Sequence, residues 1–267
     1  MNAIVLAGAG SVGVTDAKEI SPYRAGLLVG GRNLLTQTLE ALSGLPGLGQ
    51  VVLVGPGDLV PDAFKCLITT TIPPDCSLAD NLAKGLSVLP EQEQVLILAS
   101  DLPLLTTAAL QDFLSLCAGR QGDIHYPIIR KSTYVAAYPG SNRTYLTVKD
   151  GTFTGGNVAL LASPDVYRRH QEIIKKVIAW RKHPQRAGRL LGLWFLLGLL
   201  FHRRTVAEIE ARIAEGLGIR AAAVESRFSE IGYDVDSRAD LEWIEFYWGG
   251  GLEGTVRKEP GPEEEEV

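Results

Sequence analysis

Short apolar runs alternate with helical patterns over residues 1–120, and this alternation constrains the fold more than any other feature. The runs 3–7, 51–54 and 95–99 contain no polar residue, which is typical of parallel strands buried on both faces. Residues 67–72 form a weaker candidate strand. Helical spacing of apolar residues predicts helices over 34–42, 77–89 and 106–117, with Ser77 and a threonine at the starts of the last two. Strands and helices in this order predict an α/β fold with right-handed crossovers.

The second half of the chain has a different pattern. Residues 134–138 and 144–148 are strand-like, which predicts a β insertion within 124–150. Residues 163–225 are predicted to be mostly helical. A last strand is expected over Ile231–Val235 and a last helix over Ala239–Trp248.

A glycine-rich loop follows the first predicted strand. Gly8, Gly10 and Gly13 fit G-x-G-x-x-G, a spacing that lets backbone N–H groups approach a diphosphate. The pattern alone admits a dinucleotide-binding oxidoreductase as well as a nucleotide-binding site of another kind. Pro22 limits any helix after the loop to about two turns, which disfavours the dinucleotide fold.

Carboxylates follow two of the predicted strands. Asp101 comes directly after the run 95–99, and Asp234 and Asp236 follow the expected last strand. Ligands of open α/β sheets bind beyond the carboxyl ends of the strands. One or two carboxylates plus substrate phosphates are the usual ligands of Mg²⁺. A magnesium site is therefore expected there, whereas Asp240 is expected to be solvated or to cap the last helix.

Six segments in order along the chain resemble the MobA-like NTP transferases, which are related to molybdenum-cofactor guanylyltransferases and have a GT-A-like fold. They cover residues 1–162 and about 229–248. The six segments are AIVLAGAG (3–10), RAGLLVGGRNLL (24–35), CSLADNLAKGL (76–86), SDLPLL (100–105), GTFTGGNVALL (151–161) and DVDSRADL (234–241). The sequence departs from the family pattern in two places. Ser11–Asp16 lacks the family's arginine, and Arg24 stands where a lysine is usual.

The resemblance implies a Rossmann-like GT-A nucleotidyltransferase fold, with a mostly parallel sheet flanked by helices. It also implies Mg²⁺-dependent transfer of a nucleotidyl group from an NTP to a phosphate or hydroxyl acceptor, with release of pyrophosphate. The implied catalytic residues are Arg24, Lys18, Asp101 and Asp236, of which Asp101 and Asp236 bind the metal. The implied nucleotide-binding residues are Leu6, Ala7, Gly8, Ala9, Gly10, Ser11, Ser77, Asn81 and Asp101. The implied acceptor-binding residues are Gly155, Gly156 and Asn157. Two alternatives stay open, an NAD(P)-binding oxidoreductase and a non-catalytic nucleotide-binding protein associated with membranes.

Under the same resemblance the core comprises 1–162 and 229–248, with a helical insertion over 163–228 and a disordered acidic tail over 249–267. Within the insertion, Leu190–Phe201 has no polar side chain and is flanked by basic residues. Twelve residues are too few to span a bilayer, which needs about 20. Two interpretations remain open for this run. It is either a helix buried against the sheet or in a homodimer interface, or a peripheral membrane contact or groove for a lipid-like acceptor.

Composition indicates where a protein of this kind works. The net charge of −5 includes four glutamates at 263–266, so the rest is close to neutral and nucleic acid is not an expected partner. The three cysteines have no metal-ligand spacing, and the N-terminus fits a buried strand better than a signal peptide. These features predict a cytoplasmic protein.

Overall fold

The computed structural model describes residues 1–10, 21–141, 143–180, 198 and 201–247. Its strands are β1 (Asn2–Leu6), β2 (Leu28–Val29), β3 (Arg32–Asn33), β4 (Val51–Val54), β5 (Thr70–Ile72), β6 (Val95–Ala99), β7 (Ile124–Arg130), β8 (Leu146–Val148), β9 (Gly151–Gly155), β10 (Val158–Leu161) and β11 (Ala221–Glu225). Its α-helices are α1 (Leu34–Ser43), α2 (Leu78–Ser87), α3 (Thr107–Ala118), α4 (Lys131–Ala137), α5 (Pro164–Trp180), α8 (Val206–Leu217) and α9 (Arg238–Phe246). Short 3₁₀ helices are η1 (Arg24–Gly26), η2 (Gly57–Leu59), η3 (Asp62–Phe64) and η4 (Ser229–Gly232).

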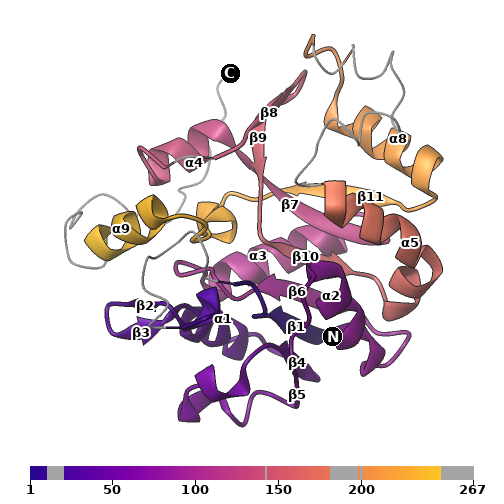
Figure 1. The fold of residues 1–267 in the computed structure, drawn as a ribbon. Helices are drawn as coiled ribbons and strands as arrows, with labels where there is room; N and C mark the ends of the chain where they lie inside the picture. Colours follow the sequence, from indigo (N-terminus) through magenta and orange to yellow (C-terminus); the bar gives the residue numbers. More distant parts are fainter. Residues whose placement is uncertain (11–20, 142, 181–197, 199–200, 248–267) are drawn as a thin grey trace.

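One mixed sheet organises the described part of the chain (Figure 1). Its strand order is β5-β4-β1-β6-β10-β7-β9-β8, and β11 pairs with the free side of β7. The pairings make β10 and β9 run opposite to the other strands of this sheet. The prediction of an α/β fold with a mostly parallel sheet flanked by helices is confirmed.

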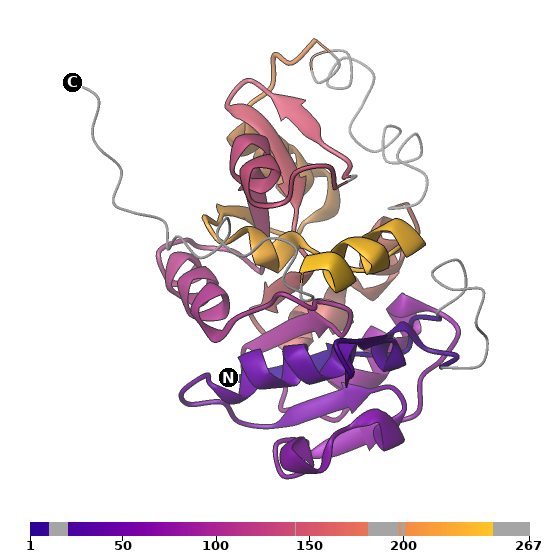
Figure 2. The ribbon, with the colours of Figure 1, turned by 90° about the vertical axis from the view of Figure 1, so that its left-hand side faces the viewer.

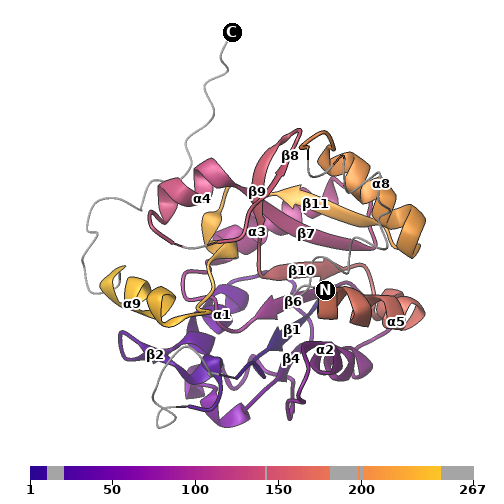
Figure 3. The same cartoon turned by 45° about the horizontal axis from the view of Figure 1, so that its top comes forward.

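Both faces of the parallel half are buried, which explains why its strands lack polar residues. Alternate side chains of β1 and β4 enter two separate clusters, one under α1 and α3 and the other under α2 and α5. Figure 3 shows α1 and the α2–α5 pair on opposite sides of these strands, and α2 packs against α5. The predicted caps are confirmed, since Ser77 Oγ accepts from the backbone N of Asp80 and Thr106 Oγ1 from that of Ala109.

The strand expected over Tyr134–Tyr138 is wrong, because these residues belong to α4 and to the residue that ends it. Residues four apart share a helix face, and here the two tyrosine rings lie 5.1 Å apart with both side chains buried. The strand expected over 144–148 forms only as β8, which pairs with β9. In Figure 2, turned by 90°, this hairpin and α4 stand above the parallel half of the sheet.

Two further expectations need correction. Residues 163–225 are not helical to their end, because β11 occupies 221–225 and pairs in parallel with β7 of the central sheet. Ile231–Val235 is not a strand. Its alternate residues Ile231, Tyr233 and Val235 are buried, which produced the strand-like pattern, but the backbone forms η4 and then an irregular segment.

Several predictions fall outside the described residues. They concern Ser11, Gly13 and Lys18, the acidic tail, and all of Leu190–Phe201 except Gly198 and Phe201. Among the described helices, none combines the length and the apolar content that crossing a membrane requires.

Candidate functional site

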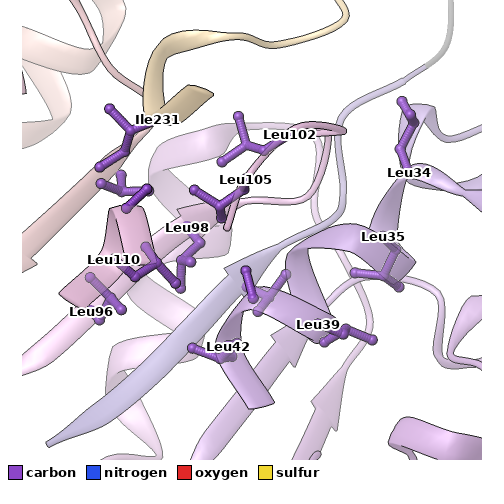
Figure 4. Close-up of a cluster of buried hydrophobic side chains, with 14 of the residues drawn as sticks. Leu34, Leu35, Leu39, Leu42, Leu96, Leu98, Leu102, Leu105, Leu110 and Ile231 are labelled. Carbon is purple, nitrogen blue, oxygen red and sulfur yellow. The ribbon is translucent and has the colours of Figure 1, made fainter. Parts of the chain in front are cut away.

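Asp101 lies where the parallel strands end. It follows β6, whose neighbour β1 ends beside it through the pairing of Leu6 with Ala99. Leu102 and Leu105 point into the hydrophobic core (Figure 4) and anchor the chain after the aspartate. Asp101 itself is only 6% exposed. The glycine loop and this carboxylate therefore share one edge of the sheet.

Backbone hydrogen bonds bring the segment after η4 to the same edge. The N–H of Val235 donates to the carbonyl of Asp101 at 3.2 Å. Asn157 connects this segment to the sheet. Its backbone N–H donates to Ile231 O (2.9 Å) and its Nδ2 donates to Gly232 O (3.2 Å). Its backbone carbonyl accepts from the N–H of Ala99, at the end of β6 (3.2 Å). Asp234 and Asp236 flank Val235 and are held beside Asp101 by these bonds.

Arg24 joins the glycine loop to two of the carboxylates. Its backbone N donates to Ala9 O (3.0 Å) and its Nε to Gly10 O (3.2 Å). Its Nη1 donates to Asp101 Oδ2 at 3.2 Å and also to Asp236 Oδ1. We call Arg24, Asp101 and Asp236 the Arg24 cluster. It assembles three of the four predicted catalytic residues, and Lys18 lies outside the described residues.

The charges of the Arg24 cluster compensate each other in part. Burial lowers the pKa of Arg24, but the charges of Asp101 and Asp236 outweigh it, so the net direction is upward. Burial raises the pKa of Asp101, and the Arg24 charge opposes this rise without cancelling it. A carboxylate buried to this degree needs a cation beside it at neutral pH.

A second arginine–aspartate pair lies next to the first. Arg143 Nη1 donates to Asp234 Oδ1, its Nη2 donates to Gly155 O at 2.9 Å, and its guanidinium lies 5.6 Å from the Tyr134 ring centre. Burial raises the pKa of Asp234 to about 7, with Arg143 lowering it and Asp101 and Asp236 adding to the rise. We call Arg143 and Asp234 the Arg143 pair. Nothing in SNRTY (141–145) marks Arg143 as a site residue, so the sequence did not predict it.

The predicted base-side residues pack directly against the glycine loop. A Cβ on Gly8 would lie 2.7 Å from Asn81 Nδ2 and 2.6 Å from Pro74 Cβ, so only glycine fits there. Asn81 Oδ1 accepts from the N–H of Asp75 at 2.5 Å, and its Nδ2 donates to Asp75 O. Asn81 thus shapes the backbone that faces the loop, and Ser77 caps α2 beside it.

The predicted acceptor segment also depends on close backbone approach. A Cβ on Gly156 would lie 2.8 Å from Pro127 Cγ and 3.1 Å from Ile231 O. The carbonyl of Gly155 accepts a hydrogen bond from Arg143. The side chain of Asn157 donates to Gly232 O, in the segment that leads to Asp234 and Asp236. The structure therefore brings Gly155, Gly156 and Asn157 together with the carboxylates.

The donor set can be compared with the needs of Mg²⁺. One guanidinium nitrogen contacts oxygens of both Asp101 and Asp236, so a positively charged group already bridges the two carboxylates. No set of three or more histidine, cysteine, aspartate or glutamate side chains suited to a metal ion occurs among the described residues. Two carboxylates completed by substrate phosphates and water fit the usual coordination of Mg²⁺.

Comparison with known proteins identifies a family for this chain. Residues 3–225 match the model of the MobA-like NTP transferase domain. A search of curated protein sequences found no significant match. A hypothetical transferase from Thermus thermophilus has a TM-score of 0.79 and 34% identity, over 90% of this chain and 98% of that one.

Two more distant solved structures show the fold alone. CMP:2-keto-3-deoxy-manno-octonic acid synthetase, solved with CTP, has a TM-score of 0.57 and 13% identity over 94% of this chain and 99% of that one. The 4-diphosphocytidyl-2C-methyl-D-erythritol synthase of Anaerococcus prevotii has a TM-score of 0.54 and 14% identity over 93% and 96%.

Proposed function

On the premise that this chain belongs to the MobA-like NTP transferase family and is a nucleotidyltransferase of GT-A-like fold, we propose that it transfers a nucleotidyl group to a small-molecule acceptor in a Mg²⁺-dependent reaction that releases pyrophosphate. The family membership favours a transferase over an NAD(P)-binding oxidoreductase and over a non-catalytic membrane-associated protein.

The Arg24 cluster is the observation that carries the proposal. Transfer at an α-phosphate needs positive charge where the triphosphate and the leaving pyrophosphate gather negative charge. Arg24 supplies one such charge at the glycine loop, and Asp101 with Asp236 would hold Mg²⁺, which supplies Lewis-acid stabilisation of the phosphates. Because the Arg24 guanidinium contacts both carboxylates, it would have to leave them for Mg²⁺ to be held there.

The remaining assignments complete the proposed site. The backbone of Leu6, Ala7, Gly8, Ala9, Gly10 and Ser11 binds the phosphates, and Lys18 is a second counter-charge. Ser77 and Asn81 lie toward the base or ribose. Gly155, Gly156 and Asn157 lie toward the acceptor, a phosphate or hydroxyl compound that attacks the α-phosphate in line.

A binding experiment tests the nucleotide half of the proposal without knowledge of the acceptor. Titration calorimetry with each of the four NTPs, with Mg²⁺ and with excess chelator, should show at least one NTP whose affinity falls about tenfold or more when the metal is removed. Asp101→Asn should remove this metal dependence. Lack of metal-dependent binding for all four NTPs would contradict the proposal.

A turnover experiment tests the transfer half. Pyrophosphate release from the best-binding NTP should begin when a protein-free extract of small molecules is added, and it should be about 10²–10³-fold slower with Asp101→Asn. A variant of the exposed Lys149 on the β8–β9 turn, Lys149→Gln, serves as the control that keeps activity.

Four further expectations stay predictions: membrane contact through residues 190–201, a lipid-like acceptor, a homodimer and the cytoplasmic location. Flotation with anionic liposomes at low salt tests the first two, and absence of binding would remove the membrane version.

A further inference from the structure

Five aromatic side chains form a continuous cluster between α4, the segment after η4, and α9. The ring centres lie 5.1 Å apart for Tyr134 and Tyr138, 4.9 Å for Tyr138 and Tyr233, 5.6 Å for Tyr138 and Trp243, 5.2 Å for Tyr233 and Trp243, and 5.4 Å for Trp243 and Tyr247. We call these five residues the aromatic cluster. The elements that carry it, α4, η4 and α9, lie together on the left of Figure 1.

Tyr233 connects the aromatic cluster to the aspartates of the site. Its side chain is buried, and its ring packs against that of Trp243. Its hydroxyl donates to the backbone carbonyl of Asp240 at 3.2 Å. This bond joins the two ends of residues 233–240, which we call the closed segment, and Asp236 lies inside it.

The closed segment is also fixed at its middle. Val235 is fully buried, and its N–H donates to the carbonyl of Asp101. The N–H of Asp236 donates to Asp240 Oδ2 at 3.2 Å. The side chain of Asp236 is largely exposed, so little packing surrounds its carboxylate. Its position relative to Asp101 therefore depends on the backbone of the closed segment.

Trp243 holds α9 against the closed segment. It lies in the second turn of this helix, and its ring contacts three other rings of the aromatic cluster. Aromatic pairs at these distances add stability beyond the area that they bury. The first turn of α9 carries Asp240, whose carboxylate bonds to the backbone of Asp236. A shift of the helix would therefore move Asp236 as well.

We propose that Tyr233 and Trp243 are positioning residues, which set the place of Asp236 opposite Asp101 so that both carboxylates reach one metal ion. They act through the backbone of the closed segment. Mg²⁺ binds oxygen ligands at about 2.1 Å and tolerates little deviation from octahedral geometry, so a small displacement of one carboxylate weakens the site. The inference rests on the proposed function, because it takes Asp101 and Asp236 as the metal ligands.

The test measures the Mg²⁺ concentration that the full-length protein needs to bind its best-binding NTP at half the maximal affinity. Calorimetric titrations over a series of Mg²⁺ concentrations give this value. Tyr233→Phe keeps the ring and removes the bond to Asp240, so it should raise the value about fivefold. Trp243→Leu should raise it about tenfold, and Trp243→Phe should restore most of the loss. At saturating Mg²⁺ all variants should approach the NTP affinity of the wild type.

A second readout uses the protein without metal or nucleotide. Hydrogen exchange followed by NMR should show the N–H groups of Val235 and Asp236 exchanging several-fold faster in Tyr233→Phe than in the wild type. Leu89→Ala is the matched control, because Leu89 is buried in the separate cluster under α2 and α5. It should lower the thermal midpoint and leave the Mg²⁺ requirement unchanged.

The outcomes separate the positioning role from the proposed function. An unchanged Mg²⁺ requirement in both Tyr233→Phe and Trp243→Leu would overturn the positioning role, and so would an equal increase in Leu89→Ala. NTP binding by the wild type that does not depend on Mg²⁺ would instead count against the proposed function. Faster exchange at Asp236 in that case would still show that the tyrosine hydroxyl fixes the closed segment.

Discussion

The Arg24 cluster and the Arg143 pair use the same two residue types but differ in exposure and in what surrounds them. In the Arg24 cluster the Asp236 side chain is 61% exposed, whereas the Asp234 side chain of the Arg143 pair is 11% exposed. Arg24 contacts two carboxylates and the glycine loop, while Arg143 is fixed by Asp234, a backbone carbonyl and a ring. The first group therefore leaves one of its carboxylates, Asp236, open to a ligand, whereas the protein encloses the second group.

The largest effect is expected from Asp101→Asn. It removes the buried carboxylate of the Arg24 cluster and leaves the Arg143 pair intact. Pyrophosphate release should fall by about 10²–10³-fold, the range seen when a single electrostatic group is lost from a transition state. Steady-state kinetics measures the change, with circular dichroism as a check of folding. A loss below tenfold would mean that Asp101 is not a metal ligand.

Arg143→Met should mainly affect stability. It leaves Asp234 buried without its cation, which should lower the free energy of unfolding by about 3 kcal/mol at pH 8. Urea denaturation at pH 8 and pH 5 measures this. The loss should be smaller at pH 5, where the carboxyl of Asp234 takes up a proton. Arg143→Met combined with Asp234→Asn should restore part of the loss, and an unchanged loss in the double variant would contradict the pairing.

Arg24→Ala should expose the carboxylates that the guanidinium now contacts. Without nucleotide, Mn²⁺ affinity measured by electron paramagnetic resonance should rise about tenfold, because a competing cation is gone. NTP affinity should fall in the same variant. Equal Mn²⁺ affinity in wild type and variant would show that Arg24 does not compete with the metal.

The raised pKa of Asp234 predicts a pH dependence of stability. An acid whose pKa is raised on folding binds more protons in the native state, so its contribution is complete below its unfolded pKa and is lost as pH rises toward 7. Between pH 4 and 7 this residue alone should lower the free energy of unfolding by up to about 1.4 kcal/mol per pH unit. Asp234→Asn should flatten that slope, and an unchanged slope would assign it to other groups.

The smallest effect is expected from Asp240→Ala. Asp240 Oδ2 accepts from the backbone N–H groups of Asp236 (3.2 Å) and Ser237 (2.8 Å), forming a capping box at the start of α9. Its removal should cost about 1 kcal/mol of stability. Activity should fall several-fold, because Asp236 loses the hydrogen bond from its backbone N–H to Asp240. The loss of unfolding free energy caused by Arg143→Met should be the same with and without Asp240→Ala.

The sequence predicted the parallel half of the sheet well, and the structure brings its candidates Arg24, Asp101 and Asp236 into contact. In that half, strands buried on both faces must be apolar, so the runs are easy to recognise. The carboxyl ends of parallel strands meet at one edge of the sheet, so the carboxylates that follow them are expected to lie close together. The second half was predicted poorly. Tyr134 lies in α4 and Tyr138 ends it, with the two rings packed together. Ile231–Val235 follows strand-like alternation in a segment hydrogen-bonded to Asn157 and Asp101. Arg143 was missed because tertiary contacts alone give it a role.

The bridge between Gly10 and Tyr23 has a consequence for how this site can vary. It joins the two ends of the intervening stretch of chain, and Arg24 follows immediately. Loop-closure entropy grows only with the logarithm of loop length, about 0.6 kcal/mol for each doubling. A change in the number of residues between the bridged pair should therefore cost little stability. The bridge keeps Arg24 beside Gly10 in each case.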